Sequence, residues 1–483
     1  MTITSTSVVI VGTGIAGAWL AYRLAQRGIE TVVISSEPVE NTPAVSRQWA
    51  ASVINRRLVQ DDPDSTADLF EDASTTQHPE LQPLVRRYFR PEFAELSQIV
   101  DFMPFHFALI PRHAVPVPRL GAGNEVVTAV LDKFISLGGK IIEGRVTHLN
   151  VADGVCRGLQ FERNGEPHKL LCEALVLASG GFSGLFADSM TNNTGSLLGT
   201  FARCGGTLAN LEFFKRFAFG DLTRRRLLYP QDLEEAHLYR DGERATWLYN
   251  AQTCYPPEKF DLEVFQTYWS RNFGVPHTAE LASGSVSLGP IRGFSMGGIA
   301  HHQGVSNLSN VFATGEARHD LAVDYTTSLP WACYLASGGM LCDVLSQRSR
   351  TDCLQDFPLK PVPRALNVSL LSEVRRHLAN FQDQRFSEKG ALQFIAWCRE
   401  VRKQMHCDGQ QDDEDFDLLI LAEAYTQSAL VRTESRGYFF RADFPCTNSI
   451  MSNQYTCARY DIATDRVDVD MVVHDKELSK SHY

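Results

Sequence analysis

A buried strand, a glycine turn and a helix follow one another in Val8–Gly28, which reads VVIVGTGIAGAWLAYRLAQRG. The β-branched residues before the turn suit a strand buried on both faces, and alanine and leucine recur at helical spacing after it. Of the three glycines, Gly12 makes the tight turn, Gly14 lets a pyrophosphate approach the backbone, and Gly17 lets the helix pack closely on the strand. The stretch therefore predicts a dinucleotide-binding βαβ unit, with the phosphate charge at the helix N-terminus.

Two groups of residues should contact the dinucleotide in this unit. The turn contributes Gly12, Gly14, Ile15, Ala16 and Gly17. The second strand, Thr31 to Ile34, should end near an acid that binds the adenosine ribose, but Ser35 and Ser36 follow it and Glu37 comes two residues late. A serine hydroxyl also bonds a ribose hydroxyl, so we expect Ser35 and Ser36 to take that role.

Composition narrows the class of protein. A chain of 483 residues is long enough for two or three domains. The formal net charge of −11 argues against a nucleic-acid surface, and the single basic cluster, Arg224 to Arg226, predicts a solvated loop. No apolar run approaches the roughly 20 residues of a transmembrane helix, and none precedes the first strand. We therefore expect neither a membrane span nor a signal peptide.

The cysteines and histidines indicate a cytoplasmic protein without a metal site. The eleven cysteines are scattered and form no Cys-x-x-Cys pair, which is typical of reduced proteins of the cytosol. His301 and His302 are adjacent, so in a strand they point to opposite faces and predict no shared metal ion.

Strand and helix patterns continue along the chain. The amphipathic stretch Gly123–Leu137 predicts a helix, and Ala174–Ala178 predicts a buried strand that ends at the double glycine Gly180–Gly181. This second step from strand to glycine indicates a second backbone approach to the same extended ligand. From about 211 to 284 the composition becomes aromatic and mixed in charge, which we interpret as an inserted domain.

The rest of the chain returns to the sheet and then becomes helical. The parallel-sheet pattern recurs at Gly297–Ile299 and at Val311–Ala313, and a helix opens at Ser328. Residues 366–437 have helical spacing, and Gln454–Val473 predicts a terminal β-hairpin.

Five stretches resemble, in order, the fumarate reductase, succinate dehydrogenase and L-aspartate oxidase flavoproteins. They are GTGIAGAWLAYRLAQRG, ASGGFSGLF, GGTLANLEF, SMGGIAHHQGV with VFATGEA, and RTESRGYFFRADFP. The C-terminal portion is most similar to the adenylylsulfate reductase flavoprotein. The resemblance implies an α/β fold with a two-part Rossmann-type FAD domain, an inserted α+β capping domain and a helical C-terminal domain. We expect the FAD domain at 1–210 and 285–350, the cap at 211–284, and the C-terminal domain with its hairpin at 351–483.

The resemblance also implies FAD contacts outside the glycine turn. Val146 takes the position from which relatives hold the adenine, and Glu316 the position that bonds ribityl or ribose hydroxyls. Ser328 and Leu329 open the helix that faces the flavin pyrimidine edge and stabilises negative charge there. Further contacts are expected at the double glycine and in the loop under the isoalloxazine: Ala178, Gly180, Gly181, Ser46, Trp49 and Ala50. Relatives with covalent FAD carry a histidine where this chain has Ser46, so we expect non-covalent FAD.

The residues that bind dicarboxylates in this family are absent. Gly293 stands at the first substrate histidine and Phe217 at the second, while the arginine before the flavin helix falls near Val323. A clamp for two carboxylates needs several cationic contacts, so aspartate, succinate and fumarate are poor candidates.

Other side chains stand beside these positions. Arg292 precedes Gly293 and Arg216 precedes Phe217. Together with Phe217 and Phe294 they predict a site for one anionic group and an apolar or aromatic body.

The candidate catalytic residues are Arg292, His319 and Tyr325. His319 is the expected proton acceptor. Alternatives stay open: Arg292 and Arg318 pair with nearby acids such as Asp320, and Tyr325 is a core aromatic.

We therefore expect an FAD-dependent oxidase or dehydrogenase that removes a hydride from a small mono-anionic substrate, such as an amino-acid derivative. No second fingerprint for NAD(P)H is present, so oxygen, a quinone or a partner protein should reoxidise the flavin. One alternative is a sulfur-oxyanion or electron-transfer flavoprotein similar to adenylylsulfate reductase, although the chain is much shorter than those subunits. The other is a non-catalytic FAD-containing binding protein.

Overall fold

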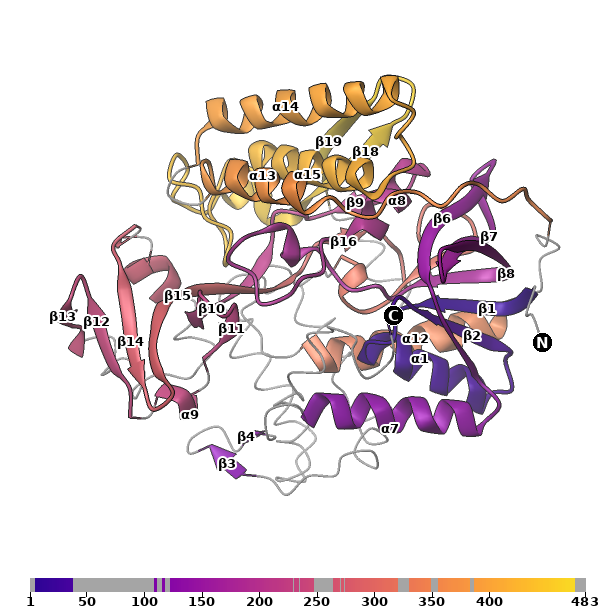
Figure 1. Cartoon of the computed structure of the whole chain (residues 1–483), viewed down its shortest axis with the longest axis horizontal. Helices are drawn as coiled ribbons and strands as arrows, with labels where there is room; N and C mark the ends of the chain where they lie inside the picture. The colour runs from indigo at the N-terminus through magenta and orange to yellow at the C-terminus, as the bar shows by residue number, and fades with distance from the viewer. Residues whose placement is uncertain are drawn as a thin grey trace.

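The computed structural model has a nucleotide-binding part, a capping sheet and a C-terminal group of helices (Figure 1). The capping sheet lies to one side of the nucleotide-binding part, and the C-terminal helices lie above both in the view of Figure 1. The expected α/β fold with these three parts is confirmed. The described residues are 5–37, 108–110, 115–117, 122–228, 230–233, 235–246, 264–269, 271–272, 274–319, 330–348, 355–382 and 386–473.

A seven-stranded sheet forms the nucleotide-binding part. Its order is β5-β2-β1-β8-β7-β6, and β17 also pairs with β8. The strands are β1 (Ser5–Val11), β2 (Thr31–Ser35), β5 (Lys140–Glu143), β6 (Arg145–Ala152), β7 (Val155–Arg163), β8 (Glu166–Leu177) and β17 (Val311–Ala313). β1 pairs in parallel with β2 and β8, which places Ile10 opposite Val33 and Val176. These three side chains are fully buried, so the β-branched run forms the doubly covered strand that the sequence predicts.

Three helices lie together on one side of this sheet (Figure 1). α1 (Ile15–Gln26) packs against α7 (Ala122–Ser136) and α12 (Pro330–Gln347). Trp19 of α1 is completely buried. A short two-stranded sheet is formed by β3 (Ala108–Ile110) and β4 (Val115–Val117).

The cap is a six-stranded antiparallel sheet with its own apolar core. Its order is β11-β10-β15-β14-β12-β13. The elements are β10 (Phe214–Asp221), β11 (Arg226–Leu227), α9 (Pro230–Leu233), β12 (His237–Arg240), β13 (Glu243–Arg244), a π-helical turn (Val264–Trp269), β14 (His277–Leu281) and β15 (Gly284–Ser295). β15 runs through residues 284 and 285, where we expected a domain boundary, and carries the chain back to the nucleotide-binding part.

The turn between β10 and β11 is fastened to a neighbouring loop. Arg225 donates hydrogen bonds at 2.8 Å to the Ser189 and Thr191 carbonyl oxygens and to Asn192 Oδ1. The prediction of a solvated loop is therefore wrong for Arg225, because its guanidinium group supplies the donors that these oxygens need.

A third sheet joins distant parts of the chain, in the order β16-β9-β18-β19. Its strands are β9 (Thr207–Ala209), β16 (Gly298–Ile299), β18 (Gln454–Asp461) and β19 (Arg466–Val473). β18 and β19 form the predicted hairpin. The prediction for Gly297–Ile299 is wrong, since β16 pairs antiparallel with β9 and does not enter the parallel sheet. A two-residue strand carries too little pattern to show which sheet it joins.

The C-terminal helices bury α15 (Glu414–Val431) against α14 (Glu388–Cys407) and against α8 (Ser196–Arg203) of the nucleotide-binding part. α13 (Val368–Ala379) begins at Asn367, whose side chain accepts the Ser369 N–H. Short 3₁₀ turns complete the described elements: η4 (Ser183–Leu185), η6 (Gly315–Ala317) and η7 (Ser449–Asn453). Within the described ranges, no helix combines the length and apolar composition needed to cross a membrane.

Candidate functional site

The glycine turn between β1 and α1 has no room for side chains. Gly12 has a φ of 115°, and a Cβ there would lie 2.3 Å from the Ala178 carbonyl oxygen. A Cβ at Gly17 would lie 2.1 Å from the Gly12 carbonyl oxygen. Gly14 caps α1 with extended backbone and no side-chain hydrogen bond. The turn thus offers bare backbone and a helix N-terminus, as a closely approaching phosphate requires.

The later part of the nucleotide-binding region packs on this turn. Ile15 and Ala16, the first residues of α1, are buried. A Cβ at Gly315, which has a φ of 67°, would lie 2.5 Å from the Ala16 Cβ. Glu316 is therefore held next to the start of α1.

Glu316 is a buried carboxyl group beside the double glycine. Its Oε1 accepts hydrogen bonds from Ser295 N at 2.9 Å and from Ser295 Oγ at 3.3 Å. A Cβ at Gly181 would lie 1.8 Å from Ser295 Oγ and 2.4 Å from Glu316 Oε1, and Gly180 has a φ of 77°. Burial raises the pKa of Glu316 to about 7, although hydrogen bonds from Ser295 and Gly181 act to lower it. We call this group of residues the cradle: Gly12, Gly14, Gly17, Gly180, Gly181 and Glu316. The cradle thus holds a carboxyl group that changes charge near neutral pH.

The expected adenosine contacts lie at the end of β2. Ser35 is buried, and its hydroxyl lies 3.1 Å from Thr13 Oγ1 and donates to the Glu37 carbonyl oxygen at 2.6 Å. Gly144 N donates to the Ser35 carbonyl oxygen at 2.7 Å, which brings the start of β6, with Val146, beside β2. Ser36 is exposed, whereas the Ser35 hydroxyl is used within the protein.

One aromatic ring lies at the two positions, Phe217 and Gly293, where the resemblance led us to look for substrate histidines. A Cβ at Gly293 would lie 2.4 Å from Phe217 Cε2, so the ring occupies the space in front of this glycine. Phe217 and Phe294 meet edge to face, with ring centroids 6.5 Å apart. Phe217, Gly293 and Phe294 therefore form an apolar wall.

Arg292 and Arg216 are paired across the β10–β15 ribbon, and both approach Asp188. Arg292 is 1% exposed, its Nε is 3.3 Å from Asp188 Oδ1, and its Nη2 donates to Gln382 Oε1 at 3.2 Å. Arg216 Nη2 is 3.8 Å from Asp188 Oδ2. Burial raises the pKa of Asp188, but the two guanidinium groups outweigh it and the net shift is downward.

This geometry bears on the expected roles of both arginines. Asp188 is the acid that pairs with Arg292, where we had named Asp320 as an example. The Arg292 guanidinium also stacks on the Phe186 ring, 3.7 Å from its centroid. Contact between either arginine and a substrate stays a prediction.

His319 is buried near a second histidine. Its backbone N–H donates to Ile299 O at 3.0 Å, and its ring stacks on Tyr455 at 5.6 Å. His301 Nε2 lies 2.9 Å from the His319 carbonyl oxygen, and Gly304 N donates to His301 Nδ1 at 3.0 Å. Burial and the nearby Arg318 charge lower the pKa of His301 to about 3, so this ring is neutral. Among the described residues, no three His, Cys, Asp or Glu side chains are grouped to hold a metal ion.

Two known protein families match this chain. The family described as FAD binding domain matches residues 7–223, and the family described as fumarate reductase flavoprotein C-term matches residues 414–481. Together these matches span more than half of the chain. The chain contains an FAD binding domain and the C-terminal domain of the fumarate reductase flavoproteins. A search of curated protein sequences found no significant match.

Solved structures of such flavoproteins have the same fold. The Escherichia coli quinol fumarate reductase flavoprotein is 15% identical, with a TM-score of 0.77 over 99% of this chain and 98% of that one. The Mycobacterium smegmatis Sdh1 chain is 16% identical, with a TM-score of 0.72 over 100% and 98%. Adenylylsulfate reductase from Archaeoglobus fulgidus is 13% identical, with a TM-score of 0.69 over 100% and 97%.

The cradle fits the cofactor of this family. Its glycines let bare backbone pack closely where a Cβ would clash, Gly14 presents the N-terminus of α1 without a side chain, and Glu316 supplies an acceptor for hydroxyl groups. FAD is the cofactor, and the flavoprotein is an FAD-dependent oxidoreductase. The individual contacts expected at Val146, Ser36 and the glycines stay predictions.

Several predicted site residues lie outside the described residues. They are Ser46, Trp49, Ala50, Tyr325, Ser328 and Leu329, together with Val323 and Asp320. The non-covalent character of FAD rests on Ser46 and also stays a prediction.

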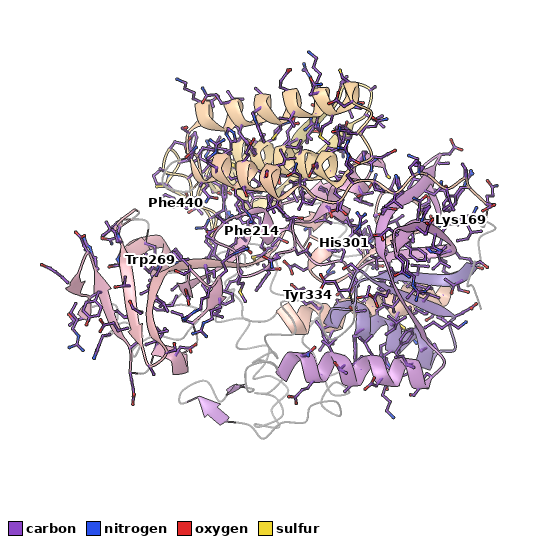
Figure 2. All side chains as sticks on the ribbon, viewed as in Figure 1. Lys169, Phe214, Trp269, His301, Tyr334 and Phe440 are labelled. Carbon is purple, nitrogen blue, oxygen red and sulfur yellow. The ribbon has the colours of Figure 1, made fainter. Side chains whose placement is uncertain are left out.

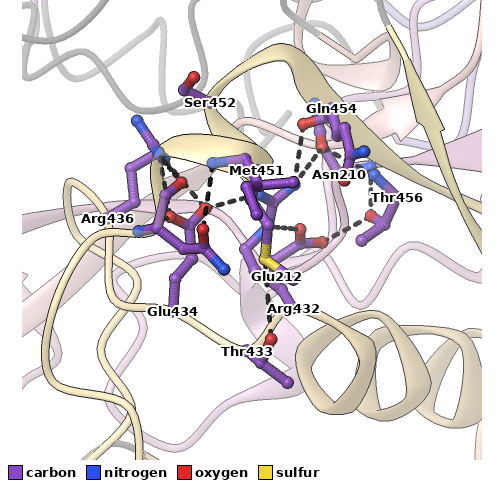
Figure 3. Close-up of polar contacts among 12 residues, drawn as sticks. Asn210, Glu212, Arg432, Thr433, Glu434, Arg436, Met451, Ser452, Gln454 and Thr456 are labelled. Carbon is purple, nitrogen blue, oxygen red and sulfur yellow. Dashed lines mark hydrogen bonds and ion pairs between the residues drawn. The ribbon is translucent and has the colours of Figure 1, made fainter.

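One buried polar cluster was not predicted from the sequence (Figure 3). Arg432, 1% exposed, donates from Nε to Glu212 Oε1 at 2.5 Å and from Nη1 to Glu434 Oε1 at 2.9 Å. Thr456 Oγ1 donates to Glu212 Oε2 at 2.8 Å. The cluster fastens the segment that leads into β10 to the C-terminal part. The cluster joins two stretches that carry the family resemblance, GGTLANLEF and RTESRGYFFRADFP. A sequence motif does not show that its charged residues contact those of another motif.

Proposed function

We propose that this flavoprotein oxidises a small organic substrate that carries one anionic group and an apolar or aromatic body. The observation that carries the proposal is the Phe217 ring in front of Gly293. In relatives these two positions hold histidines for a dicarboxylate. An aromatic wall offers contact area to an apolar body and no charge for a second carboxylate.

Bound FAD would supply the acceptor for the substrate's hydride. The residues of the chain orient the substrate and keep water away from it. The Phe217 and Phe294 rings exclude water from the reacting carbon, which strengthens every electrostatic contact there. His319 is the proposed proton acceptor, with Tyr325 as a second catalytic residue.

We further propose a quinone as the electron acceptor to test first, with oxygen and a partner protein as alternatives. Two structural relatives are complexes with quinones: a quinol-fumarate reductase with menaquinol and the Mycobacterium smegmatis Sdh1 with UQ1. We also propose a cytoplasmic location. Eight cysteines among the described residues are free, in keeping with a reducing compartment.

Anaerobic mixing tests the proposal. The FAD-loaded protein is mixed with amino and hydroxy acids that carry one carboxylate and an apolar side chain, and with succinate and L-aspartate as matched dicarboxylates. We expect at least one monocarboxylate to bleach the flavin absorbance within seconds, and neither dicarboxylate to do so. Rapid bleaching by succinate or L-aspartate alone would contradict the proposal.

A further inference from the structure

Lys215 is a buried cation between the cap and the C-terminal part. It is the second residue of β10 and is 1% exposed. Its Nζ donates a hydrogen bond to Tyr438 Oη at 2.5 Å. Burying an ammonium group is costly unless nearby groups stabilise its charge, so a buried lysine in a candidate site needs an explanation.

Aromatic faces surround this ammonium group. Nζ lies 4.6 Å from the centroid of the Tyr438 ring and 5.3 Å from that of Phe217. Both distances are within the range of a cation–π interaction. Tyr438 is 3% exposed and packs into the core of the cap, although it belongs to the C-terminal part.

Lys215 lies beside the apolar wall. It is directly opposite Phe294 in the β10–β15 register, and its Nζ approaches the face of the Phe217 ring. The register shifts between Lys215 and Arg216, and Arg216 pairs with Arg292 next to Asp188. Lys215 is therefore a cation beside Phe217 and Phe294, whereas the two arginines are directed toward an acid of the protein.

Tyr438 also lines a small cavity at the junction of the cap and the C-terminal part. The cavity is also bordered by Arg216, Arg292, Glu212, Phe214 and Phe440, so Tyr438 contacts Lys215 and also faces the space beside the two arginines. Phe214 and Phe440 mark this junction in Figure 2. A phenol that accepts a hydrogen bond from an ammonium group becomes a stronger donor through its own O–H. The pair thus combines a fixed positive charge with a directed hydrogen bond.

We propose that Lys215 and Tyr438 bind the anionic group of the substrate, with Phe217 and Phe294 packed on its apolar body. The inference rests on the proposed function and names the residues and substrate class of that site: an aromatic or apolar monocarboxylate. The ammonium group neutralises the carboxylate in a water-poor site, and the phenol fixes its orientation.

Binding of benzoate to the FAD-loaded protein tests the pair without requiring turnover. Titration is followed by the change in flavin absorbance, and the dissociation constant is measured for wild type, Lys215→Met and Tyr438→Phe. Lys169→Met is the matched control, because Lys169 also donates to the protein and lies over an aromatic ring, Phe357, far from the cap (Figure 2). FAD content and circular dichroism establish that each variant is folded and loaded.

Lys215→Met should raise the benzoate dissociation constant roughly ten- to hundredfold and Tyr438→Phe roughly two- to tenfold, as expected for a charged and a neutral hydrogen bond. Lys169→Met should leave it unchanged. An unchanged constant in folded, loaded Lys215→Met overturns the inference, as does a wild type that binds no benzoate. If Lys215→Met fails to load FAD, the Tyr438→Phe titration decides, and an unchanged constant there overturns the pair. The bleaching experiment above judges the proposed function independently of these results.

Discussion

The cradle and the apolar wall differ in what builds them. The cradle is backbone and glycine, and a Cβ at Gly12, Gly17 or Gly181 would overlap a neighbouring atom. The wall is made of side chains, and one ring, Phe217, fills the space in front of Gly293. A cofactor common to many reactions needs the same bare backbone each time, whereas a substrate site changes when side chains are exchanged on the same fold. Our proposal is that this chain keeps the chemistry of the cofactor and differs from its relatives in substrate recognition.

The sharpest test of the cradle is Gly14→Val. Gly14 has a φ of −65°, which valine also adopts, so α1 should form while the side chain fills the place of the pyrophosphate. We expect FAD content to fall to nearly zero in a folded protein. Acid precipitation of equal amounts measures it, and wild type should release its flavin into the supernatant if FAD is non-covalent. Gly28→Ala is the control: its Cβ would meet nothing within 4 Å, and although the φ of 70° makes alanine less stable there, FAD content should stay at the wild-type level. Full flavin content in Gly14→Val would contradict our description of the turn.

Arg432 holds the segment that leads into β10 and the apolar wall, and its contacts can be removed without changing the cradle. Arg432→Met leaves Glu212 and Glu434 buried without their shared cation (Figure 3). We expect a loss of about 3–5 kcal/mol in the free energy of unfolding, typical of a broken buried ion pair. FAD content should stay close to wild type, because the cradle lies elsewhere. Urea unfolding measures the change, and Arg399→Met, in which a partly exposed partner of Glu423 is lost, should cost about 1 kcal/mol or less. Equal losses in the two variants would show that the cluster has no special role.

Ionisation of Glu316 should make FAD binding by the cradle depend on pH. Its pKa of about 7 means that the carboxyl group is half protonated near neutrality, and flavin hydroxyl groups bond the ionised form better. FAD affinity should therefore rise with pH through about 7 and weaken as pH falls below it, by up to about tenfold per pH unit. Glu316→Gln should bind more weakly at pH 8 and lose this dependence, as measured by fluorescence titration of the FAD-free protein. An unchanged pH profile in the variant would assign the titration to another group.

The raised pKa of Glu316 also affects the stability of the FAD-free protein. The folded state holds the proton of Glu316 up to about pH 7, whereas the unfolded chain releases it near 4.5. The stabilising contribution is therefore complete below pH 4.5 and is lost as pH rises through about 7. Glu316→Gln should remove this part of the pH dependence of unfolding.

The cradle could be predicted from the sequence because its geometry is local. Gly12, Gly14 and Gly17 impose the turn through conformations and close approaches that only a few neighbouring residues decide. The substrate side could be predicted less well. Arg292 was expected at the substrate because it stands next to Gly293 in the sequence, whereas its pairing with Asp188, more than 100 residues away, could not be read from that position.

Lys215 and Tyr438 show what sequence spacing cannot reveal. They are 223 residues apart, and nothing local in either segment indicates that their side chains meet. The pairing depends on how the C-terminal part packs on the cap. The four-stranded sheet poses the same difficulty, since β9, β16 and β18 come from three separate regions.

The central claim is that the FAD cradle serves a site for one carboxylate and an apolar body. Titration of FAD-loaded wild type with benzoate and with succinate, followed by flavin absorbance, tests it most directly. The account predicts that benzoate saturates at a concentration at least about ten times lower than succinate, because the second carboxylate of succinate meets the Phe217 ring instead of a cation. Tighter binding of succinate than of benzoate would contradict it.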